Sequence, residues 1–224
     1  MADEVVLLDS TLSVYGMRVR IALAEKGVKY ENRDQELDFM TRNKSDLLLK
    51  MNPVHKKIPV LIHNGKPVCE SLIIVQYIDE VWKDDSPLLP SDAYHRAQAR
   101  SWGDFVDKKV YDVSRRVWST KGEEQEVAKK EFLETFKVLE GELGDKPFFV
   151  GDTFGFADIA LVTFYSWFYS IETAGQFSIE AECPKIVAWA KRCMQRESVA
   201  MTLPDQKKVY EFAMEMKKRL GLEN

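Results

Sequence analysis

The strongest constraint on the fold is a change of sequence pattern at residues 83–91. This run, KDDSPLLPS, contains two prolines and interrupts both strand and helix periodicity, which is typical of a linker between domains. Strand signals occur before it, whereas the chain beyond it is helical. A chain of 224 residues is long enough for two modest cores. We therefore predict one domain over 1–82, a linker over 83–90 and a second domain over 91–224.

The first domain alternates strand and helix signals. Residues 5–8 form a short apolar run, which predicts a strand covered on both faces. An apolar stripe over 17–24 then predicts a helix that stops at Gly27. Residues 28–32 fit a second strand, and residues 34–44 show no period and predict a loop.

A hairpin gives the clearest signal in this domain. Residues 59–62 and 67–69 flank the Asn-Gly dipeptide at 64–65, which is favoured in tight hairpin turns. Ser71 follows as the expected cap of an apolar helix over 72–82. The predicted order is a βαβ unit followed by a ββα unit.

Helical patterns fill the second domain. Apolar residues three and four positions apart predict two amphipathic helices. Their stripes are Trp102, Val106, Val110, Val113 and Val117, and Phe132, Phe136, Leu139 and Leu143. Residues 156–171 are apolar nearly all round and predict a buried helix, with Asp158 reaching back to cap its start. Residues 186–193 and 209–220 supply the remaining helices.

Composition narrows the range of partners. A net charge of -4 leaves no excess of cations for phosphates, so nucleic acid is not expected to bind. Cys69, Cys183 and Cys193 are odd in number and far apart, which argues against a disulfide framework. The N-terminus is acidic without a signal segment, and residues 156–171 are too few to span a bilayer. We expect a cytoplasmic protein with no membrane partner.

Several local sequences point to one family. They are STLSVYGMRVR at 10–20, NPVHKKIPVL at 52–61, Glu70-Ser71, GD at 151–152 and ADI at 157–159. With the element order, they resemble the plant tau class of cytosolic glutathione transferases over the whole chain. The resemblance implies an α/β plus all-α fold, with a thioredoxin-like N-terminal domain followed by an all-helical C-terminal domain. Two departures are Val14-Tyr15 in place of the usual Pro-Phe, and a longer stretch over 35–42.

The resemblance implies that glutathione is the co-substrate and Ser13 the catalytic residue. A hydroxyl at the start of the first helix can donate a hydrogen bond to the glutathione sulfur, and the helix N-terminus favours the negative charge there. Taken from the residues alone, Ser13 is more simply a helix cap. Tyr15 is the rival donor, although it stands where the tau motif has an apolar residue.

Five further residues are expected to hold glutathione. Helix N–H groups and the Ser71 hydroxyl suit the γ-glutamyl carboxylate, and Glu70 suits the α-ammonium group. The backbone of Ile58 is expected to pair with the cysteinyl unit, and the resemblance implies a cis bond to the following proline. Lys57 and Lys44 resemble the cations that receive the glycine carboxylate. Without the resemblance, these residues are a cap, a solvated acid and solvated lysines.

A hydrophobic substrate site is expected mostly in the second domain. Tyr111, Arg115 and Trp118 share one helical face, offset from the valine stripe. With Trp167 and Phe212, they are expected to line an aromatic cavity in which Arg115 polarises an oxygen of a flat electrophile. Simple packing or a subunit contact is the alternative.

The sequence supports more than one function. The first is a transferase that conjugates the glutathione thiolate to hydrophobic electrophiles in detoxification, with glutathione-dependent hydroperoxide reduction as an added activity. The alternative is a non-catalytic carrier of hydrophobic ligands, whereas a thiol–disulfide reductase needs a cysteine where Ser13 stands. The resemblance implies a homodimer. His55, His63 and His95 lack metal-ligand spacing, so we expect surface histidines and no metal.

Overall fold

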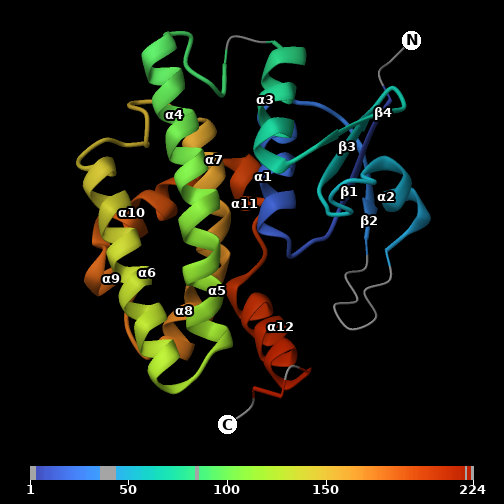
Figure 1. The fold of residues 1–224 in the computed structure, drawn as a ribbon. Coiled ribbons are helices and arrows are strands. Elements are labelled where there is room, and N and C mark those ends of the chain that lie inside the picture. Colours follow the sequence, from blue (N-terminus) through green and yellow to red (C-terminus); the bar gives the residue numbers. More distant parts are fainter. Residues whose placement is uncertain (1–3, 36–43, 84–85, 220, 223–224) are drawn as a thin grey trace. The chain divides into compact units, whose positions relative to one another are not determined.

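The first unit of the chain is α/β and the second is helical, which confirms the predicted fold class (Figure 1). The units are Met1–Leu89 and Pro90–Asn224. The computed structural model describes residues 4–35, 44–83, 86–219 and 221–222. Residues 84–85 of the predicted linker and residues 36–43 of the predicted loop lie outside the described residues.

A four-stranded sheet forms the centre of the first unit, in the order β2–β1–β3–β4. The strands are β1 (Val5–Asp9), β2 (Glu31–Asp34), β3 (Val60–His63) and β4 (Lys66–Cys69). β1 pairs parallel with β2 and antiparallel with β3, which pairs antiparallel with β4. The predicted hairpin is confirmed, because His63 pairs with Lys66 across residues 64–65, both of which have positive φ.

The strand after the first helix begins later than the sequence predicted. The prediction of a strand over 28–32 was wrong in its position, because the start of this segment is still hydrogen-bonded to the last turn of helix α1 (Val14–Glu25). Gly27 adopts φ 61°, and the N–H of Val28 donates to the carbonyl of Leu23 at 2.9 Å. The side chains of β2 are all exposed, so apolar patterning does not locate it.

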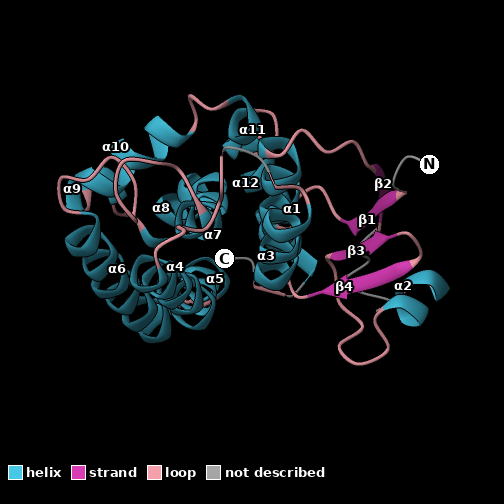
Figure 2. Cartoon of the chain, turned by 90° about the horizontal axis from the view of Figure 1, so that it is seen from above, coloured by secondary structure: helices cyan, strands magenta, loops and turns pink. Residues whose placement is uncertain are grey.

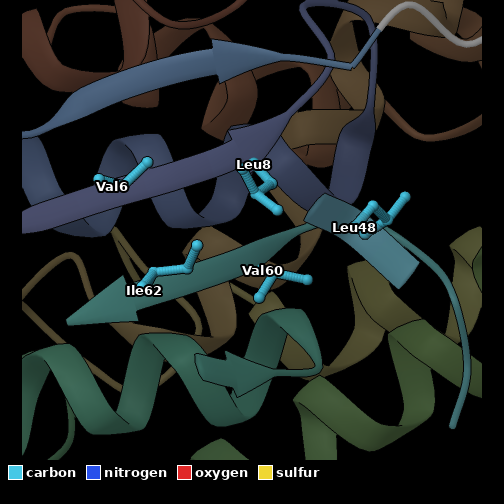
Figure 3. Close-up of a cluster of buried hydrophobic side chains, with 5 residues drawn as sticks. All are labelled: Val6, Leu8, Leu48, Val60 and Ile62. Atoms are coloured by element: carbon cyan, nitrogen blue, oxygen red, sulfur yellow. The ribbon is translucent and has the colours of Figure 1, made fainter. Parts of the chain in front are cut away.

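Both faces of the sheet are covered, as the apolar run at 5–8 predicts. Side chains alternate between the faces, and one face buries a cluster that includes helix α2, Asp46–Met51 (Figure 3). The cluster consists of Val6, Leu8, Leu48, Val60 and Ile62. Helices α1 and α3 (Ser71–Val81) lie on the other side of the sheet (Figure 2), where Val5 and Leu7 are buried.

Ser71 does not cap α3, so this prediction was wrong. Glu70 occupies the N-cap position with φ 69°, and its side chain makes no capping hydrogen bond. This left-handed φ turns the chain directly from β4 into the helix. Ser71 is therefore the first helical residue, and its hydroxyl is free of the capping role that the sequence suggested.

Helices form the second unit (Figure 1). The predicted stripes of valines and of Phe and Leu are buried in it. The longer helices are α4 (Ala93–Phe105), α5 (Tyr111–Ser119), α6 (Gly122–Leu143), α7 (Phe156–Val162), α8 (Phe168–Gly175), α10 (Pro184–Cys193) and α12 (Gln206–Arg219). The short ones are α9 (Ile179–Glu182) and α11 (Glu197–Ala200).

Two of the predicted helices are interrupted. A π-helical turn, η1 (Val106–Val110), joins α4 to α5. The prediction of one helix over 156–171 was wrong, because a 3₁₀ segment, η2 (Thr163–Trp167), separates α7 from α8. Within η2 the Ser166 hydroxyl donates to the carbonyl three residues earlier at 2.8 Å, a local bond that competes with α-helical geometry.

Candidate functional site

The predicted glutathione-binding residues of the first unit lie in connections at one end of the strands. Val60 at the start of β3 pairs with Leu8 on one side and with Cys69 on the other. The chain entering β3 therefore lies beside the chain leaving β1 and the chain leaving β4. These three connections carry Ile58, Ser13 and Glu70, respectively. The bond between Ile58 and the following proline is cis, as the resemblance implies.

Ser13 caps helix α1. Its Oγ accepts a hydrogen bond from the N–H of Gly16 at 3.2 Å, and its own N–H donates to the carbonyl of Ser10 at 3.0 Å. The side chain is half-buried at the N-terminus of a 12-residue helix. The cap expected from the residues alone is thus present, in a place where a helix favours negative charge.

A buried cation that the sequence analysis did not single out lies beside Ser71. The guanidinium of Arg18 donates to the Ser71 hydroxyl at 3.1 Å and lies over the ring of Tyr15, 5.0 Å from its centroid. Arg18 is completely buried. Arg18 and Arg20 are the two charged residues among the apolar residues of 17–24, and this is the signal that points to them.

The loop before β3 is held by Asn52, another residue that the sequence analysis did not single out. Its side chain accepts from the N–H of His55 at 3.1 Å and donates to the carbonyl of Lys57 at 2.9 Å. Asn52 is buried, whereas the lysine side chains are exposed. The ammonium group of Lys44 reaches the same loop through the carbonyl of Lys56.

Glu70 presents its carboxylate to solvent at the start of α3. The side chain is 60% exposed, and Oε1 lies 3.9 Å from Nε2 of His55. An exposed carboxylate at this position is available to a cationic group on a ligand. The loop before β3 thus contacts Glu70 through His55 and contacts Lys44 through the carbonyl of Lys56.

Three predicted aromatic residues of the second unit form one cluster. Trp118 of α5 stacks on Trp167 of η2 with ring centroids 5.6 Å apart, and Phe212 of α12 meets Trp167 edge-on at 6.2 Å. Arg115 and Tyr111 are exposed on the same helix as Trp118. The structure therefore brings the rings together and leaves Arg115 paired only loosely with a neighbouring aspartate, at 3.6 Å.

The thiols are poorly suited to redox chemistry. All three cysteines are free, and burial raises the pKa of each. The pKa of Cys183 reaches about 11, and Glu70 adds to the effect of burial at Cys69. Thiols with raised pKa values carry little thiolate and are weak nucleophiles.

Other features of the described residues involve none of these groups. A surface hollow of about 340 Å³ is lined by residues of α6 and its C-terminal turn and by the start of α10, and contains none of the predicted site residues. The expectation of surface histidines is confirmed for His55 and His95, which are exposed, whereas His63 is half-buried, with its Nδ1 2.8 Å from the Tyr77 hydroxyl. Among the described residues, no group of three acidic, His or Cys side chains could hold a metal, and no helix could cross a membrane.

Comparison with protein families identifies the group to which these features belong. Residues 4–80 match the glutathione S-transferase N-terminal domain, and residues 96–197 match the glutathione S-transferase C-terminal domain. The chain belongs to the glutathione S-transferase family. This transferase is 67% identical to a probable glutathione S-transferase, parC, from Nicotiana tabacum over 99% of both chains.

Solved glutathione S-transferases share the fold closely. A rice glutathione S-transferase in complex with glutathione is 49% identical, with a TM-score of 0.93 and 98% of each chain covered. A tau class glutathione S-transferase from mango, Mangifera indica, is 42% identical, with a TM-score of 0.88 over 94% of this chain and 97% of that chain. The transferase is a member of the plant tau class, as its motifs indicate.

Proposed function

We propose that this glutathione transferase uses Ser13 to stabilise the glutathione thiolate, which it adds to hydrophobic electrophiles. One observation carries the assignment: the Oγ of Ser13 accepts the N–H of Gly16 at 3.2 Å. A hydroxyl that accepts a hydrogen bond keeps its own proton. The Ser13 O–H therefore remains a donor for the sulfur while the oxygen caps the helix.

The energy of one such bond is sufficient for the task. A hydrogen bond to a charged group contributes about 1.5–3 kcal/mol, and one pKa unit corresponds to about 1.4 kcal/mol. One bond thus accounts for a thiol pKa lowered by about one to two units. The sulfur then bonds to an electrophilic carbon, and a leaving group such as chloride departs with the electron pair of its broken bond.

The start of α3 suits the γ-glutamyl end of glutathione. The hydroxyl of Ser71 accepts from Arg18, so its proton remains available to the carboxylate, together with the first N–H groups of the helix. The exposed carboxylate of Glu70 suits the α-ammonium group. Arg18 adds a buried positive charge that favours the carboxylate.

The loop before β3 suits the other end of glutathione. We assign the backbone of Ile58 to the cysteinyl unit and the exposed side chains of Lys57 and Lys44 to the glycine carboxylate. The domain over 1–82 thus binds glutathione, and the linker over 83–90 leads to the domain over 91–224. That second domain supplies most of the hydrophobic site.

The aromatic cluster of the second unit supports that assignment. Trp118, Trp167 and Phe212 give flat apolar surface, and Arg115 and Tyr111 give polar groups on the same helix. Organic hydroperoxides are a second substrate class. The thiolate attacks the peroxide oxygen, the alcohol leaves, and a second glutathione converts the resulting sulfenic acid to glutathione disulfide and water.

We further infer a cytoplasmic homodimer, in keeping with the free thiols of the chain and with its family. The relatives are named as transferases, which favours the enzyme over the non-catalytic carrier. Light scattering of the purified protein tests the dimer. A monomer mass near 25.9 kDa would contradict it.

The experiment that tests Ser13 compares Ser13→Ala with Tyr15→Phe. Ser13→Ala should lower kcat for a chloronitroaromatic compound by about 10²-fold or more and raise the pKa of bound glutathione. Tyr15→Phe should change neither quantity much. The thiol pKa is read from the ultraviolet absorbance of the thiolate during a pH titration. A pKa that moves only in Tyr15→Phe would identify the phenol as the donor.

A further inference from the structure

We propose that Asp9 and Arg20 are positioning residues that hold the Ser13 hydroxyl in place. The inference rests on the proposed role of Ser13 and names the residues that position its hydroxyl. Asp9 ends β1, and its side chain is completely buried. A buried carboxylate needs a charged partner, and the guanidinium of Arg20, on α1, forms a salt bridge with it.

The guanidinium of Arg20 holds the segment that leads into its own helix. Besides the carboxylate of Asp9, it contacts the carbonyl of Ser10 at 3.4 Å and donates to that of Thr11 at 2.9 Å. A planar group with several N–H donors can serve all three acceptors at once. α1 therefore fixes the short connection between β1 and Ser13.

The other side of this connection is fixed from β2. The hydroxyl of Thr11 donates to the carboxylate of Asp34 at 3.2 Å. The N–H of Gln35 donates to the carbonyl of Asp9 at 2.6 Å. The connection between β1 and Ser13 is thus anchored to the end of β2 and to α1. Arg20 supplies the anchor from α1, the helix that Ser13 caps.

Gly16 carries the effect from Asp9 to Ser13. Its N–H donates to the Oγ of Ser13 at 3.2 Å, and a Cβ at this position would overlap the carboxyl group of Asp9. Only a glycine allows the carboxyl to pack so closely against the helix. The described residues give no hydrogen bond to Oδ1 of Asp9. The ion pair with Arg20, a hydrogen bond from the backbone of Ser10 and this packing fix the carboxyl group. A change in the position of Asp9 would therefore alter the position of the Ser13 hydroxyl through one residue, Gly16.

Charge and position make opposite predictions at Asp9. The charged and titratable groups facing it are Arg20, Asp34 and Tyr30. Burial raises the pKa of Asp9 to about 6 against the attraction of Arg20, so the carboxyl is mostly ionised at neutral pH. Asp9→Asn removes a negative charge, and by charge alone it should lower the pKa of the glutathione thiol. Loss of the correct position of the Ser13 hydroxyl should instead raise the pKa of the glutathione thiol.

The experiment uses Arg20→Lys, which keeps the charge but cannot serve all three acceptors. We expect kcat to fall about ten-fold and the pKa of bound glutathione to rise, with KM for glutathione changed less than about two-fold. Asp9→Asn should raise the same pKa. The matched control is Arg33→Lys, because Arg33 pairs with a glutamate on the exposed strand β2 of the same unit.

The same variants in the Ser13→Ala background separate positioning from general structural support. If Arg20 acts through Ser13, then Arg20→Lys should have no further effect on the thiol pKa there. Equal effects in both backgrounds, an unchanged pKa in Arg20→Lys, or a lowered pKa in Asp9→Asn would overturn the inference alone. An unchanged pKa in Ser13→Ala itself would instead overturn the proposed donor, and the inference with it.

Discussion

The guanidinium of Arg18 donates to the hydroxyl of Ser71 at 3.1 Å, with both groups buried. The bond joins α1, which Ser13 caps, to the first residue of α3. Tyr15 lies against the same guanidinium. In the proposed site, the thiol end and the γ-glutamyl end of glutathione therefore depend on one buried cation.

This relationship predicts a binding defect in Arg18→Lys. An ammonium group keeps the charge but cannot both donate to Ser71 and lie flat on Tyr15. KM for glutathione should rise about ten-fold, as expected when a buried charge-assisted bond is lost. Steady-state kinetics with Lys50→Met, an exposed change on α2, as the control would check this. An unaltered KM would remove Arg18 from the site.

Glu70→Gln should weaken glutathione binding before it slows the reaction. The α-ammonium group is remote from the sulfur, so its contacts are held equally in the ground state and the transition state. We expect KM for glutathione to rise about five- to ten-fold with kcat nearly constant. Glu31→Gln, at an exposed carboxylate of β2, is the matched control. A fall in kcat with constant KM would contradict the assigned role.

Replacing the aromatic cluster should change the choice of electrophile. Trp118→Ala removes the stacking partner of Trp167, and Arg115→Ala removes the cation on the same helix. The ratio of kcat/KM between a nitroaromatic and an aliphatic electrophile should change about ten-fold or more. KM for glutathione should stay constant. Val127→Ala, at an exposed position of α6, is the control, and an unchanged ratio would favour simple packing.

Asp158→Asn should destabilise the second unit. Both carboxylate oxygens accept from N–H groups: Oδ1 from Phe149 at 3.0 Å and Trp189 at 2.8 Å, and Oδ2 from Gly155 at 3.0 Å. An amide group turns one acceptor into a donor that faces another donor. The free energy of unfolding should fall by about 2–4 kcal/mol in a urea titration. Asp152→Asn, on the exposed turn nearby, should have little effect.

The same variant should also change the pH dependence of stability. Burial raises the pKa of Asp158 from 3.8 to about 6, so between these values the folded state binds a proton that the unfolded state lacks. This contribution to stability grows as pH falls through 6 and is lost as pH rises. From pH 7 to pH 5, wild type should gain about 1 kcal/mol over Asp158→Asn. Parallel pH profiles would contradict the raised pKa.

Local patterns explain which parts of the molecule the sequence could predict. The hairpin turn at 64–65 and the cap at Ser13 depend on residues a few positions apart, and both are present. The contact between Arg18 and Ser71 joins residues 53 positions apart, so no periodic pattern contains it. The partnership of Asp9 and Gly16 likewise depends on how closely β1 approaches α1.

The interruptions of the helices show a second limit. Val106 and Val110 are four residues apart, a spacing that fits an α-helix and a π-helical turn equally well. Residues 156–171 are apolar nearly all round, and their few polar residues form no stripe that marks where the 3₁₀ segment begins. In both places tertiary packing and local bonds decide the backbone, and the order of apolar residues does not.

The stacked rings of Trp118 and Trp167 give the second unit an intrinsic fluorescence signal. The emission of an indole depends on the polarity and contacts around it, and the Nε1 of Trp167 is enclosed without a hydrogen-bond partner among the described residues. A molecule settling on this pair would alter the fluorescence whether or not it reacts. Compounds that occupy the cluster without turnover would therefore be as visible, in unlabelled protein, as true substrates.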